Sequence, residues 1–172
     1  LSLNPDYAKA HYNLGVALKE EGQLEEAISA YHQALSLNPD YAKAHSNLGV
    51  ALKEGGQLEE AISAYHQALS LNPDYAEAYN NLGIALSAQR KFEEAISYYQ
   101  RAIQLNPTFA VAYYNLGNAL SAERKFGEAI SYYKAAVELN PNYAEAYINF
   151  GNALFLEQKT EEAIFYYKMG IK

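Results

Sequence analysis

The sequence predicts an all-α protein, a solenoid of stacked helix-turn-helix units, and three observations carry this prediction. The tripeptide Asn-Leu-Gly, which becomes Asn-Phe-Gly in its last occurrence, returns at an interval of 34 residues. Apolar residues within each interval follow helical spacing, and all five prolines occupy one equivalent position. A fixed period of this length indicates one supersecondary unit copied and stacked, because each copy is too small to bury its apolar face alone.

Alignment on the period defines the expected repeats. The full repeats are residues 8–41, 42–75, 76–109 and 110–143, with an incomplete fifth repeat at 144–172 and the tail of a preceding repeat at 1–7. Since stacked copies pack only on their neighbours, we expect one continuous array over residues 1–172 without an internal domain boundary. Because the chain opens within a repeat, we interpret it as a segment of a longer protein.

Each repeat is predicted to hold two amphipathic helices, because its apolar residues recur three or four positions apart in two runs. In the first repeat these residues are Ala10, Leu14, Ala17 and Leu18, then Leu24, Ala27, Ile28, Tyr31, Ala34 and Leu35. A polar break separates the runs, where Gly22 and Gly56 suit a left-handed helix end. The third and fourth repeats have Arg90 and Arg124 at that place. The turn is therefore predicted to be short and to tolerate residues other than glycine.

The prolines are predicted to end every second helix, since the preceding Asn is biased away from helical dihedrals, and to suit the first turn of the next helix. They are Pro5, Pro39, Pro73, Pro107 and Pro141. Periodic glycines, such as Gly15 and Gly83, are expected to face periodic alanines, such as Ala27, across a close helix crossing. A Gly83→Leu change should therefore overpack the crossing and cost roughly 1–3 kcal/mol or more. Periodic tyrosines such as Tyr31 are predicted to fill the remaining space.

These motifs resemble the tetratricopeptide repeat, whose 34-residue signature places Leu-Gly, Tyr, Ala and Pro at matching positions. The resemblance covers essentially the whole chain. The sequence departs from the signature at two positions where the signature has an aromatic residue. The first position is His11 and His45 in the first two repeats and tyrosine in the later ones, and the second position is leucine in every repeat. The resemblance implies a right-handed α-solenoid whose first helices line a concave groove for a peptide or a partner protein.

The resemblance also implies which residues line that groove. One position is asparagine in every repeat, and the row closely resembles the asparagine-lined superhelix of O-linked N-acetylglucosamine transferases and similar bacterial arrays. The candidate groove residues are Asn13, Asn47, Asn81, Asn115, Asn149, Lys9, Lys43, Lys19, Lys53, Tyr12, Asn80, Tyr114, Asn118 and Asn152. Because an amide both donates and accepts hydrogen bonds, such a row suits the main chain of an extended peptide. Alternatively, the asparagines bridge neighbouring repeats or reflect recent copying of one unit.

The lysines make the first two repeats basic, which would favour a ligand with acidic residues at one end. The alternative is that these lysines only solvate an exposed face. No repeat combines Lys at the fifth position with Asn at the ninth, the pair that a chaperone-type carboxylate clamp requires. We therefore do not expect binding to chaperone C-termini.

No enzymatic activity, cofactor or metal site is predicted. His11, His32, His45 and His66 are the only histidines, and residues one repeat apart are too far from each other to share a zinc ion. The acidic pairs that open the second helices suit the positive end of the helix dipole. No phosphate-binding loop or nucleophile motif occurs.

The formal charge of −7 argues against nucleic-acid binding, and no apolar run is long enough to span a bilayer. We expect a soluble protein, most simply cytoplasmic, that acts as a non-catalytic interaction scaffold. One alternative is end-to-end self-association through the apolar last repeat, with Phe155, Leu156 and Phe165. Another is a substrate-recruiting segment of a larger enzyme such as a glycosyltransferase.

Overall fold

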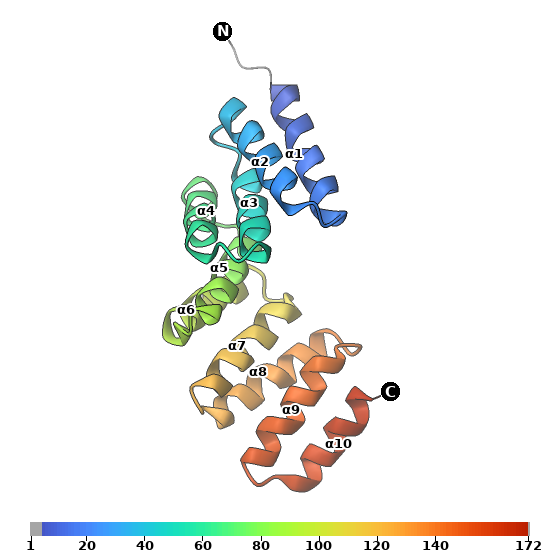
Figure 1. Cartoon of the computed structure of the whole chain (residues 1–172). Helices are drawn as coiled ribbons and strands as arrows, with labels where there is room; N and C mark the ends of the chain where they lie inside the picture. Colours follow the sequence, from blue (N-terminus) through green and yellow to red (C-terminus); the bar gives the residue numbers. More distant parts are fainter. Residues whose placement is uncertain (1–4, 172) are drawn as a thin grey trace. The chain divides into compact units, whose positions relative to one another are not determined.

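The computed structural model describes residues 5–171, and within this range the chain forms ten α-helices and no strand (Figure 1). The helices are α1 (Pro5–Glu20), α2 (Leu24–Leu37), α3 (Ala42–Glu54), α4 (Leu58–Leu71), α5 (Ala76–Ala88), α6 (Phe92–Leu105), α7 (Ala110–Ala122), α8 (Phe126–Leu139), α9 (Ala144–Leu156) and α10 (Thr160–Gly170). The predicted all-α class and the two helices per repeat are confirmed. Residues 1–4, most of the expected N-terminal tail, lie outside the described residues.

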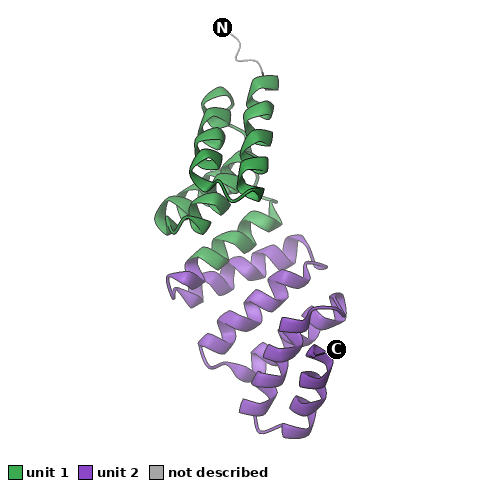
Figure 2. Ribbon diagram, turned by 45° about the vertical axis from the view of Figure 1, so that its right-hand side comes forward, with its two compact units in different colours: residues 1–85 green, residues 86–172 purple. Residues whose placement is uncertain are grey.

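The chain divides into two compact units, residues 1–85 and 86–172 (Figure 2). In the first unit α1 packs on α2, α2 on α3, and α3 on α4. In the second unit α6 packs on α7, α7 on α8, α8 on α9, and α9 on α10. Each unit is therefore built from antiparallel helix pairs that contact the pair next to them in sequence.

The turn inside each repeat closes as a Schellman motif, which satisfies carbonyl groups at the end of the first helix. At the end of α3, Gln57 N donates to Leu52 O at 2.8 Å and Gly56 N donates to Lys53 O at 3.0 Å. Gly56 has a φ of +81° and Gly22 a φ of +77°, which confirms the predicted left-handed glycines.

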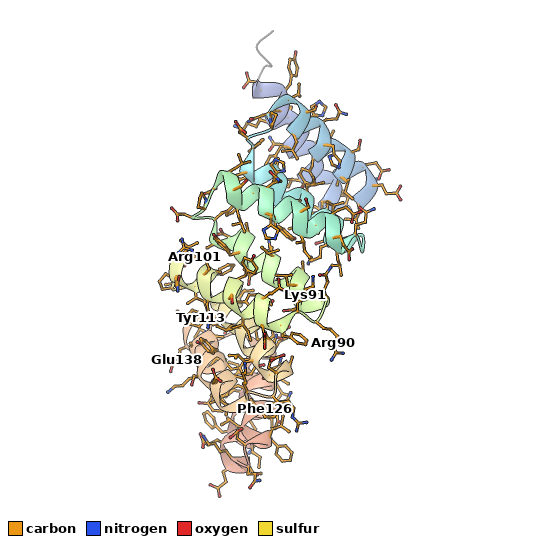
Figure 3. All side chains as sticks on the ribbon, turned by 90° about the vertical axis from the view of Figure 1, so that its left-hand side faces the viewer. Arg90, Lys91, Arg101, Tyr113, Phe126 and Glu138 are labelled. Atoms are coloured by element: carbon orange, nitrogen blue, oxygen red, sulfur yellow. The ribbon has the colours of Figure 1, made fainter. Side chains whose placement is uncertain are left out.

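The later repeats keep this geometry without glycine. Arg90, Arg124 and Gln158 have φ values of 62°, 61° and 62°. Arg90 is exposed and extends away from the ribbon beside α6 (Figure 3). A left-handed conformation costs a residue with a Cβ roughly 1–2 kcal/mol, so the backbone bonds of the turn must offset this cost.

The turn between repeats corrects the predicted role of proline. Pro39 lies between α2 and α3 rather than in the first turn of α3, and Tyr41 N donates to Asn38 O at 3.3 Å. Proline thus takes the second position of a β-turn, which requires the φ of about −65° that its ring imposes. Only Pro5 lies at a helix start, as the first residue of α1. The prediction failed because a four-residue turn separates the helices.

The helix crossing within a repeat corrects a second prediction, because the glycine of the first helix faces a tyrosine ring rather than an alanine. A Cβ built on Gly49 would lie 2.6 Å from Tyr65 Cε1, and the same distance separates one built on Gly117 from Tyr133 Cε1. Tyr65 and Tyr133 are buried, and Ala61 and Ala129 also lie in the core. The glycine therefore makes room for the largest buried side chain of the repeat.

Candidate functional site

The predicted asparagine row forms hydrogen bonds between neighbouring repeats in both units. In the second unit Asn149 of α9 reaches back to α7, where its Nδ2 donates to Tyr114 OH at 3.2 Å and to Asn118 Oδ1 at 2.9 Å. In the first unit Asn47 Nδ2 donates to Tyr12 OH at 3.1 Å. Asn47 and Asn149 thus take the bridging role that the sequence left open as an alternative.

Two tyrosines of the second helices, Tyr133 and Tyr167, donate to further asparagines of the second unit. Tyr133 OH donates to Asn118 Oδ1 at 2.8 Å, and Tyr167 OH donates to Asn152 Oδ1 at 2.9 Å. Asn152 Nδ2 donates to Asn149 Oδ1 at 3.5 Å, the limit of a hydrogen bond. We call Asn118, Asn149 and Asn152 the amide network.

The amide network lines a hollow of about 190 Å³ between α7 and α9. Ser121 and Tyr133 are polar neighbours in the lining, and Ala153, Leu156 and Phe126 supply apolar surface. Asn118 is half-buried and Asn152 is exposed, so both reach the solvent side of the hollow.

The internal bonds leave a defined set of free groups in this hollow. Within residues 5–171, Asn118 Nδ2 donates to no partner, because both bonds of that side chain use Oδ1. Asn149 Oδ1 and Asn152 Nδ2 share only their one long contact. The surface therefore offers a donor, an acceptor and a second donor. This order is complementary to the alternating C=O and N–H groups of a peptide main chain.

The tyrosines at the fifth position are held by ring contacts. The ring of Tyr114 packs against Tyr143 at a tilt, with a centroid distance of 4.8 Å, and the ring of Tyr12 packs against Tyr41 in the same way, with 5.0 Å. Tyr12 and Tyr114 are half-buried, and these ring contacts orient their hydroxyl groups. Each hydroxyl accepts a hydrogen bond from the asparagine of the next repeat. Sequence reasoning placed Tyr12 and Tyr114 in the groove but missed this pairing.

Asn80 is a correction to the predicted groove residues. Its side chain is only 3% exposed, and Ser46 at the equivalent position is 2% exposed. A ligand could not reach Asn80 without displacing the residues that cover it. The fifth position carries polar residues in these repeats, and its burial could not be read from residue type.

The remaining candidates lie at varied depths. Asn13 is exposed, whereas Asn81 and Asn115 are half-buried. Lys9 and Lys43 are exposed, and Lys19 and Lys53 are half-buried. None of these four lysines forms an ion pair with another residue of the described range 5–171. Their charges are therefore available to a partner.

The core tyrosines of the second unit have a hydroxyl partner that the sequence analysis missed. Ser87 Oγ lies 3.2 Å from Tyr99 OH, and Ser121 Oγ lies 3.1 Å from Tyr133 OH. The first two repeats have Lys19 and Lys53 at that position, and within the described part of the chain the buried hydroxyl of Tyr65 has no hydrogen-bond partner. A serine twelve residues before the tyrosine was the available signal.

Burial raises the pKa of these phenols. The pKa of Tyr99 rises to about 12, although its bond with Ser87 opposes the rise. The pKa of Tyr133 also rises to about 12 through burial, with Ser121 opposing. Burial and then the nearby Tyr12 raise the pKa of Tyr31 to about 12. All three remain neutral at physiological pH and serve as hydrogen-bonding and packing groups.

Ser87→Ala should destabilise the second unit more than Ser121→Ala. Ser87 is the single hydroxyl partner of Tyr99 within residues 5–171, whereas Tyr133 keeps its bond to Asn118 when Ser121 is lost. A buried polar group left without a partner costs about 1–3 kcal/mol. Urea denaturation followed by helicity measures the difference, and equal effects of the two substitutions would contradict the pairing.

Residues 5–171 contain no group of three or more His, Asp or Glu side chains that could hold a metal ion. His32 is exposed on α2, and His45 is half-buried on α3. The acidic pair Glu25 and Glu26 occupies the first turn of α2, as predicted from the helix dipole. Across the same residues, no helix is both long and apolar enough to cross a membrane.

Comparison with protein families identifies the chain. Models described as tetratricopeptide repeat match residues 76–109 and 110–143, and also 1–29 and 132–165, while a model described as TPR repeat matches 17–55 and 51–90. The chain belongs to the tetratricopeptide repeat family. Repeats of this family are in general interaction modules rather than catalysts.

Solved structures of other tetratricopeptide arrays are similar to this one. A crystal structure of MamA is 30% identical, with a TM-score of 0.83 over 91% of this chain and 92% of that one. Pseudomonas aeruginosa pilF is 27% identical, with a TM-score of 0.90 over 96% of this chain and 76% of that one. YrrB, described as a TPR protein with an unusual peptide-binding site, is 27% identical, with a TM-score of 0.76 over 98% of this chain and 87% of that one. A comparison with curated proteins found no match.

Proposed function

We propose that this tetratricopeptide array is a non-catalytic scaffold that binds an extended peptide segment of a partner protein on the amide network of its second unit. The observation that carries the proposal is the donor, acceptor and donor set that Asn118, Asn149 and Asn152 leave free around the hollow between α7 and α9. These groups match the carbonyl and amide groups of a peptide backbone. The peptide-binding site named for YrrB supports a binding role for this family.

Two features make the amide network suitable for recognition rather than only for repeat packing. The internal bonds hold Asn118 and Asn149 in place from α8 and α7, so their free groups are already oriented before a ligand arrives. Preorganised side chains lose less entropy on binding. Leu156, which is 56% exposed, offers apolar contact for a ligand side chain at the edge of the hollow.

The lysines of the first unit provide a second determinant. Lys9 and Lys43 are exposed without ion-pair partners in the described residues, so acidic residues of the same partner would be attracted to that unit. This attraction should weaken as salt is added, because exposed charges are screened. Binding by the amide network should depend little on salt.

Asn118→Asp tests the proposal in a precise way. The carboxylate still accepts from Tyr133 and Asn149, but it cannot donate to a peptide carbonyl. Peptides selected from a library by the wild-type chain should bind this variant more weakly, by about 2- to 10-fold for each lost bond. Isothermal titration calorimetry measures the change.

Asn140→Asp is the matched control, because Asn140 Oδ1 accepts from Asn142 N and its side chain is exposed at the end of α8. It adds the same charge away from the amide network and should bind peptides like the wild type. If no peptide binds, or if Asn118→Asp binds as well as Asn140→Asp, the asparagines are structural and the proposal fails.

Self-association is a second candidate function, favoured by the apolar surface of the last repeat. Phe155, Leu156 and Phe165 are 57%, 56% and 58% exposed. Several large apolar side chains exposed in one repeat favour an interaction surface there. Light scattering over a range of protein concentrations, with Phe155→Ser and Phe165→Ser as comparison, would separate this candidate from peptide binding by a monomer.

A further inference from the structure

A second hollow, of about 470 Å³, lies in the first unit and is separate from the amide network. The helices α2, α3 and α4 form its walls, with Ile28 and Leu35 from α2, Leu48 and Leu52 from α3, and Ala64 from α4. Its volume is within the range of pockets that hold small ligands or side chains. The aliphatic side chains supply most of the surface of the hollow, so it suits an apolar group, and the polar residues His32, Gln57, Ser63 and Gln67 also line it.

The repeat pattern explains why this hollow exists. Two positions of the repeat, the fourth and the twenty-third, hold a pair of tyrosines in the last three repeats but His and Ala in the first two. The pairs are His11 and Ala30, His45 and Ala64, Tyr79 and Tyr98, Tyr113 and Tyr132, and Tyr147 and Tyr166. The second repeat thus lacks a phenol ring where α4 faces α3.

The second unit shows which group this framework accommodates at that place. Tyr132 lies against Tyr113 with ring centroids 6.4 Å apart, and Tyr166 against Tyr147 with 6.3 Å. These distances are typical of favourable aromatic pairs. In the first unit His45 takes the place of the first ring of the pair, and Ala64 leaves the place of the second ring open.

The polar groups of the hollow define the rest of the ligand. His45 Nε2 donates to Pro39 O at 2.9 Å, which holds the imidazole ring at the wall of the hollow. Glu60 is exposed at the rim, and no Lys or Arg belongs to the lining. A ligand that places a positive charge beside its aromatic ring would therefore be complementary in charge.

We propose that the hollow between α2, α3 and α4 binds an aromatic side chain of a partner peptide, with the ring packed against His45 and Ala64 and an adjacent basic residue paired with Glu60. This site lies on other helices than the amide network and does not depend on the function proposed for it. One chain would then contact a partner through two separate surfaces.

The test uses isotope-labelled protein and three short blocked peptides, Gly-Tyr-Lys-Gly, Gly-Ala-Lys-Gly and Gly-Tyr-Gln-Gly, titrated by NMR. Gly-Tyr-Lys-Gly should shift the resonances of Ile28, Leu48 and Ala64. The alanine peptide should bind about tenfold more weakly or worse, because it lacks the buried ring. Glu60→Gln should weaken the binding of Gly-Tyr-Lys-Gly severalfold and leave the affinity for Gly-Tyr-Gln-Gly unchanged.

The double variant His45→Tyr with Ala64→Tyr restores the tyrosine pair of the later repeats and should abolish binding. Ser29→Tyr, on the exposed face of α2 outside the hollow, adds the same side chain and should bind like the wild type. The proposal is overturned if the double variant still binds, if the shifts map elsewhere, or if the alanine peptide binds equally well. If free p-cresol binds with the same affinity as Gly-Tyr-Lys-Gly, the proposal that the occupant is a peptide is overturned. If the double variant does not fold, the Glu60→Gln comparison still decides.

Discussion

Gly117→Ala is expected to destabilise the second unit by about 1–3 kcal/mol, a large effect for the addition of one methyl group. The new Cβ would lie 2.6 Å from Tyr133 Cε1 and 2.8 Å from Cδ1. The ring cannot move away easily, because Tyr133 is 1% exposed and its hydroxyl is bonded to Asn118 and Ser121. Urea denaturation followed by circular dichroism measures the loss.

Gly127→Ala is the matched control for this substitution. A Cβ at Gly127, in the first turns of α8, would meet nothing within 4 Å. Alanine is the better helix former, but Gly127 lies in the first turn, so this change should stabilise the unit by at most about 0.5–1 kcal/mol. If the two substitutions had the same effect, the tyrosine would not be the group that requires glycine at the crossing.

Alkaline unfolding is the second expected result of large effect. The pKa values of Tyr31, Tyr99, Tyr133 and Tyr143 are raised from 10.0 to about 12, with burial as the first cause in each case. Since each folded pKa lies above the unfolded one, the folded state holds these protons more tightly. The resulting stabilisation is complete below about pH 10 and is lost as pH rises towards about 12. Helicity recorded against pH should fall in that window.

Tyr65→Phe tests the cause of this alkaline transition. Burial raises the pKa of Tyr65 as well, and its hydroxyl has no hydrogen-bond partner within the described residues. Phenylalanine removes the group that ionises without orphaning a partner, so the midpoint should move to higher pH. Tyr7→Phe, at a residue that is 63% exposed, should leave it unchanged. Identical midpoints in the two variants would argue against buried phenols as the cause.

The residues of the candidate site were predicted from the sequence, and bridging between repeats was one of the roles left open for the asparagine row. The period placed Asn47 and Asn149 in one row, and the resemblance to the tetratricopeptide repeat implied that Asn118 and Asn152 also line the groove. Their bonds to Tyr12, Tyr114 and the core tyrosines were not predictable, because they join residues of different helices across a packed interface. Asn80 shows the same limit, since residue type suggested exposure and packing buried it.

The residue pattern was enough to predict the repeat length, the two helices of each repeat, the left-handed turn at Gly22 and Gly56, and membership in the tetratricopeptide repeat family. These features depend on local periodicity and backbone preference, which a one-dimensional pattern contains. That Gly117 faces Tyr133, and that His45 and Ala64 leave a hollow, became visible once the helices were packed together. Such features depend on which side chains meet when helices pack, because the volume and hydrogen-bonding groups available at each point are set by several helices at once.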